Sequence, residues 1–320
     1  MYPLKFYPIL KDRIWGGTKL GDVLGKDLKC DTVGESWEIS GVTGDVSVVC
    51  NGDLKGESLT KLIAGDAEGF LGKSVVQRFG TEFPILIKFI DAKHDLSVQV
   101  HPDDTLARAR HNSFGKTEMW YIMDAVPGAH IIVGFKHDVS MQEYTECLKN
   151  GSLPHILHNE DVARGDAFFI NAGRIHAIGA GVLLAEIQQT SDITYRVFDF
   201  NRRDKDGKLR ELHTELALEA IDYERKEDFR VPYPKVPNTA NTMVECPYFT
   251  TKFLNLSNEY RADHSQRDSF TIYMCTDGEA SIENEDGIAS IKKGETVMIP
   301  AHSAGINVKT RGAELLEITL

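Results

Sequence analysis

Short apolar segments bounded by turn-forming residues recur along most of the chain. The segments richest in Ile, Val, Phe and Tyr are 83–91, 96–101, 118–125, 129–135 and 165–200. Asp, Gly, Pro and Asn separate them, and these residues commonly end strands and form turns. Many short strands at close spacing are typical of a β-sandwich or jelly roll, whereas alternating strands and helices would indicate a parallel sheet. The pattern therefore predicts a mainly β fold.

Helical patterns are few and short. The expected helices are 140–151, 212–223 and pieces of the stretch 58–79. That stretch is expected to break at its three glycines, Gly65, Gly69 and Gly72, because glycine weakens a helix interior. We therefore expect a few short helices around β-domains.

A proline-rich stretch divides the sequence. Three prolines lie in the first seven positions of 231–243, and proline fits neither a helix interior nor a central strand. We expect a linker there, between a catalytic β-domain at 1–230 and a smaller β-domain at 244–320. The Asp-Gly pairs at 277–278 and 286–287 are expected turns within the smaller domain.

The two domains contain a weak internal repeat. Gly165 is followed by an apolar run and, further on, by His176, and Gly294 is followed by an apolar run and then by His302. Both segments are similar to the second motif of cupins, a strand and a tight turn before a candidate ligand. This similarity predicts two related cupin-like jelly rolls. The second is expected to be degenerate, with His302 structural, because the other polar residues are missing there.

Composition and charge narrow the possible partners. The 320 residues carry a net charge of −12 with no offsetting basic stretch, which argues against a nucleic-acid binder. Five cysteines without a C-x-x-C pair indicate a reducing compartment rather than a disulfide scaffold. No run approaches ~18 apolar residues, and the N-terminus is too polar for a signal peptide. We expect a cytoplasmic protein with no membrane contact, either monomeric or a weak homo-oligomer.

Five polar residues lie at strand positions that can share one face. Gln99 and His101 are two positions apart, as are Lys116 and Glu118, so each pair points to one side of its strand. His176 follows a glycine-rich turn. Each residue alone fits an ordinary hydrogen-bonded role, but together they predict a metal site.

The expected ligand trio is compatible with two metals. Two imidazoles and one carboxylate, with a position left for water or substrate, form a catalytic zinc set. The same trio suits non-haem iron.

A second polar group lies in the segment "AEIQQTSDITYRVFDF". Glu186 and Gln188 share one strand face, and Arg196 stands within an apolar strand. An arginine is costly to bury there unless it meets an anion. Arg196 either forms an internal ion pair with Glu186 or faces the metal cavity, where it could bind phosphate or stabilise an oxyanion.

Several motifs together resemble one family, the class I phosphomannose isomerases (mannose-6-phosphate isomerases), in their short bacterial form. The resemblance runs in order from about residue 4 to the C-terminus, through "RIWGG", "GESWEISG", "LSVQVHPDD", "GKTEMWYI", "GRIHAIGAG" and "AEIQQTSDITYRVFDFNRRDKDGKLRELH". It implies cupin-like jelly rolls, one zinc ion per chain, and interconversion of mannose 6-phosphate and fructose 6-phosphate.

The resemblance also assigns roles to the metal-binding residues. His101, Glu118 and His176 fall on the family's zinc ligands. Gln99 matches a ligand glutamine of longer members, and the resemblance leaves two roles for it, a ligand or a neighbour of the ligands. Where longer members have "NHKPE", this chain has "FGKTE".

Three further residues are candidates for catalysis. Arg196 falls on the family's catalytic arginine and Lys116 on an active-site lysine, and both are expected to bind substrate. Isomerisation through a cis-enediol also needs a base, for which Glu186 is the candidate because burial can raise the pKa of a glutamate.

Three alternatives stay open at this point. The trio could hold iron in a cupin dioxygenase, or a structural metal in a non-catalytic sugar-binding cupin. A family member could also act on an unphosphorylated sugar or on a different sugar phosphate.

Overall fold

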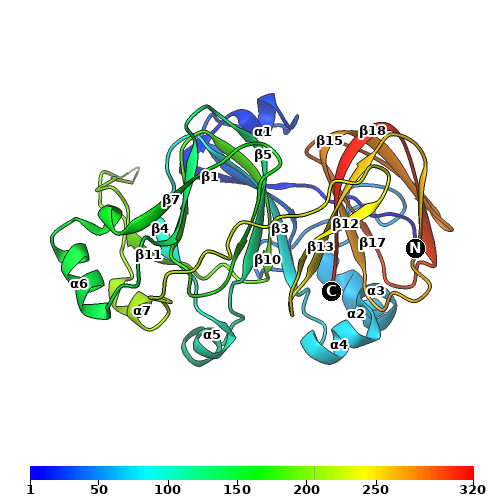
Figure 1. Cartoon of the computed structure of the whole chain (residues 1–320). Helices are drawn as coiled ribbons and strands as arrows, with labels where there is room; N and C mark the ends of the chain where they lie inside the picture. Colours follow the sequence, from blue (N-terminus) through cyan, green and yellow to red (C-terminus); the bar gives the residue numbers. More distant parts are fainter. Residues whose placement is uncertain (205) are drawn as a thin grey trace.

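The computed structural model describes residues 1–204 and 206–320. It is mainly β, as predicted, and is built from three antiparallel sheets in two units (Figure 1). One sheet of the first unit has the order β1 (Ile9–Gly17), β2 (Val33–Ile39), β3 (Ile85–Ala92), β10 (Val182–Gln189), β5 (Glu118–Ala125), β8 (Ala167–Ile170). Its second sheet has the order β11 (Tyr195–Phe198), β4 (Val98–Val100), β9 (His176–Ile178), β6 (His130–Phe135), β7 (Leu157–Asp161).

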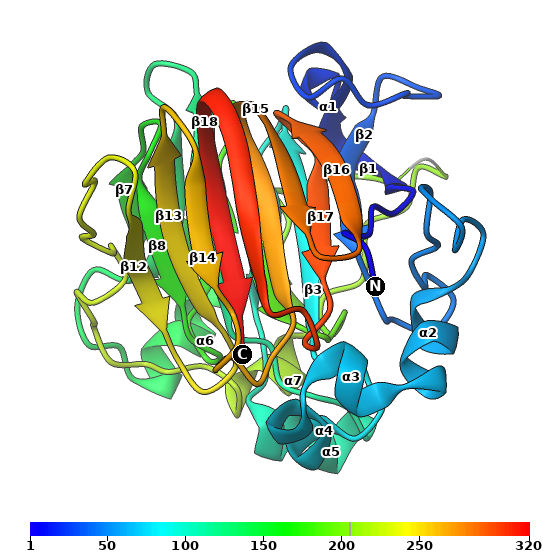
Figure 2. The same cartoon turned by 90° about the vertical axis from the view of Figure 1, so that its right-hand side faces the viewer.

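The third sheet forms the C-terminal unit (Figure 2). Its order is β12 (Ala240–Glu245), β13 (Thr250–Leu256), β18 (Gly305–Thr319), β15 (Thr271–Asn284), β16 (Gly287–Lys292). In addition, β14 (Tyr260–Asp263) pairs with β18, and β17 (Thr296–Ile299) pairs with β15. β12 begins inside the stretch 231–243 that we expected to be a linker, and the domain boundaries stay a prediction.

Most predicted strands are present, with shorter ends. The segment 118–125 is a strand over its whole length, because its apolar residues are buried on both faces. The segment 96–101 contributes only the three residues of β4, and Pro102 lies just beyond it. Proline has no N–H to donate to a ladder, which is consistent with the early end of the strand.

The helices are short, as predicted. They are α1 (Lys19–Asp22), α2 (Leu59–Gly65), α3 (Ala67–Leu71), α4 (Lys73–Phe79), α5 (Asp104–His111), α6 (Met141–Lys149), α7 (Thr214–Leu218) and a 3₁₀ turn at Leu153–His155. The predicted break at Gly69 is wrong, because Gly69 lies within α3 and its N–H donates to the Asp66 side chain at 3.0 Å as an N-cap contact. Helix α5 was not predicted, because its one buried residue, Ala107, gives no apolar period.

One of the two predicted Asp-Gly turns is wrong. Strand β15 runs through Asp277 and Gly278, with a register shift between Cys275 and Asp277. Gly278 has a φ of +71°, and a Cβ there would lie 2.0 Å from a backbone oxygen of β18. A positive φ therefore serves a β-bulge here rather than a chain reversal. The pair at 286–287 does form the turn between β15 and β16.

Two apolar cores, one on each side of the six-stranded sheet, position the site. Trp120, Phe168 and Leu184 belong to the core between the two sheets of the first unit. On the outer side of its six-stranded sheet, a larger core joins the sheet to the C-terminal unit and to α2–α4. In Figure 1 these helices lie beside the C-terminal unit, and Figure 2 shows the N-terminus next to β17. A backbone bridge between Leu4 and Met298 agrees with that placement.

The shared core makes Phe270 important for stability. Its side chain is fully buried, and its ring centroid lies 5.2 Å from that of Phe83. We expect Phe270→Ala to lower the free energy of unfolding by about 3–5 kcal/mol, because the cavity left behind spans both units. Urea unfolding followed by circular dichroism would measure it, with the exposed Ile288→Ala as control. An unchanged midpoint for Phe270→Ala would contradict the shared core.

No helix of the described residues is long and apolar enough to cross a membrane.

Candidate active site

The sheets bring together three predicted metal ligands. His101 follows β4, Glu118 opens β5 and His176 opens β9. One candidate ligand atom from each side chain lies within 4.8 Å of the other two. The Glu118 carboxylate lies 3.6 Å from Nε2 of His101 and 3.4 Å from Nε2 of His176. Residues 75 positions apart thus form one cluster because β4 and β9 pair in one sheet while β5 lies in the facing sheet.

The three side chains are buried, and some of their polar atoms have no hydrogen-bond partner among the described residues. His101, Glu118 and His176 are each about 1% exposed or less. Nε2 of His101 and both carboxylate oxygens of Glu118 have no hydrogen-bond partner among the described residues. Buried polar atoms without partners are costly, so this cluster fits a bound cation.

Hydrogen bonds on the far side of each ring orient the histidines. Nδ1 of His101 lies 3.0 Å from the carbonyl of Ile193, and Nδ1 of His176 lies 2.8 Å from that of Arg174. A carbonyl can only accept, so each Nδ1 carries the proton and each Nε2 keeps its lone pair. Metal-binding histidines are commonly held this way.

Burial also sets the charge states of the trio. Burial, together with the charge of Lys116, lowers the pKa of His101, and burial lowers the pKa of His176 to about 4. Both rings are therefore neutral at pH 7, which is the ligand form. Burial raises the pKa of Glu118 to about 7, although Lys116 at 3.4 Å opposes this. A metal dication would favour the charged carboxylate.

Gln99 lies beside the trio. It pairs with His176 across β4 and β9, and its side-chain Nε2 lies 3.3 Å from Nε2 of His176. Rotating the amide by 180° about its last bond would exchange nitrogen for oxygen at this position. Gln99 could therefore offer an oxygen to the same centre or position His176.

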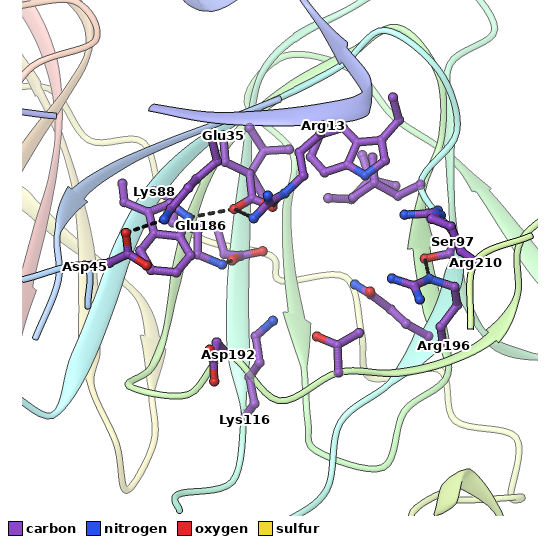
Figure 3. Close-up of a pocket in the computed structure, with 18 residues that line it drawn as sticks. Arg13, Glu35, Asp45, Lys88, Ser97, Lys116, Glu186, Asp192, Arg196 and Arg210 are labelled. Atoms are coloured by element: carbon purple, nitrogen blue, oxygen red, sulfur yellow. Dashed lines mark hydrogen bonds and ion pairs between the residues drawn. The ribbon is translucent and has the colours of Figure 1, made fainter. Parts of the chain in front are cut away.

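A cavity of about 440 Å³ opens next to the trio (Figure 3). Gln99 and Lys116 line it, and so do Glu186 and Arg196. Six cationic side chains and four carboxylates line the cavity: Lys11, Arg13, Lys88, Lys116, Arg196 and Arg210, with Glu35, Asp45, Glu186 and Asp192. The local excess of cations reverses the net charge of −12 of the chain and would attract an anion.

Arg196 faces this cavity. Its Nε donates to Ser97 Oγ at 3.3 Å and its Nη1 donates to the carbonyl of Glu211 at 2.8 Å. The alternative of an ion pair between Arg196 and Glu186 is wrong for the described side chains, because Glu186 pairs with Lys88 instead.

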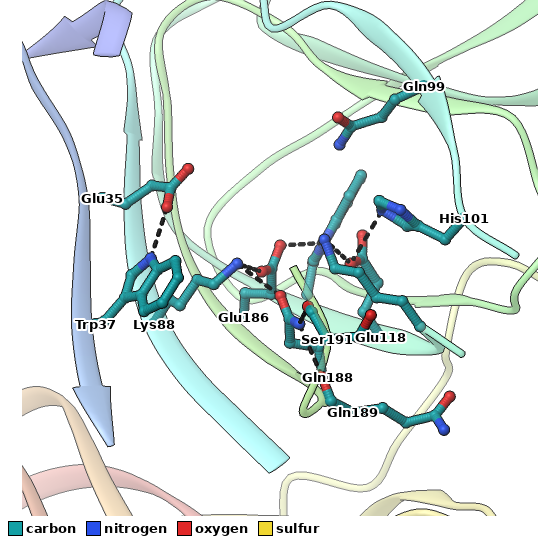
Figure 4. A network of polar contacts seen from close by, with 12 residues as sticks. Glu35, Trp37, Lys88, Gln99, His101, Glu118, Glu186, Gln188, Gln189 and Ser191 are labelled. Carbon is teal, nitrogen blue, oxygen red and sulfur yellow. Dashed lines mark hydrogen bonds and ion pairs between the residues drawn. The ribbon is translucent and has the colours of Figure 1, made fainter. Parts of the chain in front are cut away.

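Glu186 is held in a buried network (Figure 4). Its Oε1 accepts from Lys88 Nζ at 2.8 Å, and its Oε2 accepts from Trp120 Nε1 at 3.2 Å. Lys88 also donates to Gln188 at 2.6 Å. Burial favours the neutral acid, but the charges of Lys88 and Lys116 outweigh it and lower the pKa of Glu186. The expectation of a raised pKa is therefore wrong, because it ignored these two cations.

Sequence reasoning missed several residues of the cavity. Lys88 stands in the apolar run "FPILIKFID", and an isolated lysine in a buried strand was a signal that could have found it. Glu35 and Arg13 lie in the quoted motifs "GESWEISG" and "RIWGG", and the two side chains pair at 3.0 Å. Burial raises the pKa of Glu35, but Lys88 and Arg13 outweigh it and lower that pKa to about 2. Arg210 gave no such signal.

Comparisons with known proteins agree on one family. Residues 4–124 match the family model for phosphomannose isomerase type I, catalytic domain, and residues 239–316 match the mannose-6-phosphate isomerase cupin domain. Mannose-6-phosphate isomerase ManA of Bacillus subtilis is 37% identical over 301 residues, which is 93% of each chain. Mannose-6-phosphate isomerase of Streptococcus mutans is 34% identical and covers 93% of this chain and 92% of its own.

A solved structure also matches over the whole chain. The crystal structure of the mannose 6-phosphate isomerase from Bacillus subtilis superposes with a TM-score of 0.90 at 32% identity, and the match covers 100% of both chains. The paired cupin-like architecture is therefore that of this solved relative.

Proposed function

The chain belongs to the type I phosphomannose isomerase family, and from that premise we propose that it interconverts D-mannose 6-phosphate and D-fructose 6-phosphate with one zinc ion per chain. The observation that carries the proposal is the buried His101–Glu118–His176 cluster with its unpartnered ligand atoms. It lies beside a cavity lined by an excess of cations. One feature fits a metal ion and the other fits an anionic substrate.

The proposed ligands are His101, Glu118 and His176, with Gln99 as a ligand or positioning neighbour. Two neutral imidazoles and one carboxylate match a catalytic zinc set. When bound, the ion would supply positive charge for the substrate's oxygens and for negative charge that develops on them.

Arg196 and Lys116 are the proposed contacts for the substrate's anionic groups. Arg196 projects a guanidinium into the cavity while Ser97 and a backbone carbonyl hold it from behind. Lys116 lies at the junction of the trio and the cavity, 3.4 Å from Glu118. Planar guanidinium groups bind phosphate oxygens in pairs, whereas an ammonium acts as a point charge.

Glu186 is the proposed proton carrier. Isomerisation removes a proton from C2 of the aldose and returns one to C1, through a cis-enediol. The carboxylate must be ionised to accept the proton, and the charges of Lys88 and Lys116 keep it so at neutral pH by lowering its pKa against the effect of burial. The same hydrogen bonds from Lys88 and Trp120 fix its orientation.

The competing functions fit the cavity less well. A dioxygenase that uses iron on the same trio has no need of several arginines and lysines beside it. A non-catalytic sugar-binding cupin leaves the oriented, ionised Glu186 without a role. Both remain outcomes of the test below.

The test combines metal analysis with an isomerase assay. We expect about one zinc per chain, loss of mannose 6-phosphate to fructose 6-phosphate conversion on chelation, and recovery when zinc is restored. The activity should depend on the metal because Nε2 of His101 and both carboxylate oxygens of Glu118 have no hydrogen-bond partner among the described residues. Full activity of metal-free protein, or iron together with oxygen uptake, would reject the proposal.

Two further predictions accompany the function. We propose a cytoplasmic location and a monomeric or weakly oligomeric state, and size-exclusion chromatography with light scattering would measure the latter.

A further inference from the structure

The two units repeat the same strand pairing. The neighbours β3, β10, β5 and β8 in the first unit correspond to β13, β18, β15 and β17 in the second. Gly165 precedes β8 and Gly294 precedes β17, each with a φ of +85°. These glycines align β8 with β17, and the strand pairings match the positions on the other strands.

An aromatic–carboxylate pair occurs at the same position in both units. Trp120 lies opposite Glu186, and Tyr273 lies opposite Glu317. Trp120 Nε1 donates to Glu186 at 3.2 Å, and the Tyr273 hydroxyl donates to Glu317 at 2.6 Å. The buried glutamate of the first unit therefore has a counterpart in the second.

A lysine accompanies each glutamate. Lys88 of β3 pairs with Glu186, and Lys252 of β13 pairs with Glu317 in the same register. The ammonium-to-carboxylate distances are 2.8 Å and 3.8 Å respectively. The looser contact in the second unit leaves Glu317 in need of another cation.

The carboxylate ligand is replaced in the second unit. Glu118 lies opposite Ile170, the last residue of β8, and Thr271 lies opposite Ile299, the last residue of β17. Thr271 therefore occupies the position of Glu118.

One histidine ligand is replaced and the other is kept. His176 pairs with Gln99 across β9 and β4, and Ile306 pairs with Ala262 across β18 and β14. Four residues of β14 pair with β18, and Ala262 is the one that a histidine follows at the spacing of Gln99 and His101, so we match Ile306 to His176. His101 comes two positions after Gln99, and His264 comes two positions after Ala262.

That retained histidine, His264, faces Arg267. A guanidinium nitrogen of Arg267 lies 3.2 Å from Nε2 of His264 and donates to Thr271 Oγ1 at 2.8 Å. The other terminal nitrogen donates to Glu317 at 3.0 Å. A guanidinium only donates, so Nε2 of His264 is the accepting nitrogen, as Nε2 of His101 is the free one in the first unit. Burial and the charge of Arg267 lower the pKa of His264 to about 4, so the ring is neutral.

We propose that the guanidinium of Arg267 takes the place of the metal ion in a second, vestigial metal site. The argument takes the trio of the first unit as a metal site and so rests on the proposed function. An arginine stays charged at all physiological pH values, and it supplies the cation that buried Glu317 requires. The C-terminal unit then needs no metal, and the chain holds one ion although it has two cupin-like units.

Metal counting on rebuilt sites tests this proposal. In the triple variant Arg267→Ala, Thr271→Glu, Ile306→His, the lost ligands return and the guanidinium is removed. After incubation with Zn²⁺ and desalting, we expect one more zinc per chain than in the parent. The matched double variant Thr271→Glu, Ile306→His keeps Arg267 and should gain none. A folded triple variant without extra zinc, or an equal gain in both variants, would overturn the proposal.

Single substitutions give a second test that does not depend on the triple variant folding. We expect Arg267→Ala to lower the unfolding temperature by about 5 °C, because buried Glu317 is left with the distant Lys252 as its cation. Arg267→Lys, which keeps a cation, should recover at least half of the loss. Arg261→Ala, on an exposed side chain nearby in the sequence, is the control. An Arg267→Ala variant as stable as the parent would refute the charge replacement.

These readouts separate the inference from the proposed function. The first test compares the zinc content of each variant with that of the parent protein. It does not use isomerase activity. If the first site held zinc without isomerase activity, the expected gain in the triple variant would still be one. Failure of the isomerase assay alone would therefore leave this count unaffected.

Discussion

Replacing Glu186 with glutamine is expected to lower turnover by about 10³-fold, because the amide cannot carry the proton between C2 and C1. The substitution keeps the shape of the side chain and the position of its Oε1, which accepts from Lys88 at 2.8 Å in the parent. Initial rates of mannose 6-phosphate conversion would measure the effect. Zinc content should match the parent, since Glu186 is not among the proposed ligands.

Two controls make the Glu186 result specific. Glu283→Gln, on an exposed strand of the C-terminal unit, should leave turnover unchanged. A Glu186→Gln variant that retains zinc and works at more than about a tenth of the parent rate would remove Glu186 from proton transfer.

The pH dependence of the reaction offers a further measure of the same residue. Because Lys88 and Lys116 lower the pKa of Glu186 against burial, its ionised form should persist below the usual pKa of a glutamate. Lys88→Met removes the nearest cation, so burial should then raise that pKa. The acid limb of kcat/KM should move to higher pH in this variant. An unmoved limb would mean that another group carries the proton.

Arg196→Ala is expected to reduce turnover by about 100-fold, because it removes a preorganised cation from the cavity wall. The guanidinium is held by Ser97 and by the carbonyl of Glu211, so little reorganisation is needed when an anion arrives. Steady-state kinetics would show whether kcat or KM changes. A fall in kcat indicates contact with developing charge, whereas a rise in KM alone indicates equal binding of substrate and transition state.

A matched substitution tests the position of this cation. Arg203→Ala lies in the same segment, and its side chain donates to the carbonyl of Gly207 at 2.7 Å, outside the residues that line the cavity. It should keep the parent kinetics. Near-normal turnover in Arg196→Ala would exclude Arg196 from the mechanism.

Alternation along strands was enough to select His101 and Glu118, two of the three proposed metal ligands, from the sequence. Gln99 and His101, like Lys116 and Glu118, are two positions apart, and such residues share a face whatever the strand packs against. The register of β4 with β9 then brings Gln99 beside His176. Local geometry dictates the relations within each strand, so these could be predicted without coordinates, whereas the pairing of β4 with β9 could not.

The direction in which the pKa of Glu186 changes could not be predicted from the sequence. Whether burial raises its pKa or nearby cations lower it depends on Lys88, which is 98 residues away and pairs with it across β3 and β10. Burial and nearby cations change the pKa of a carboxyl group in opposite directions by similar amounts. Only the distances between the groups show which effect is larger. The same reason hid the contribution of Arg13 and Glu35 to the cavity.

The sequence by itself determined the β character, the proposed ligand residues and the family resemblance, because these depend on spacing and residue type within short segments. The tertiary structure decided which charges meet. It placed Arg196 on the cavity wall rather than on Glu186, and it placed Arg267 between His264 and Glu317. Electrostatic interactions act through space and fall with distance, so residues far apart in the chain control them only once the sheets have formed.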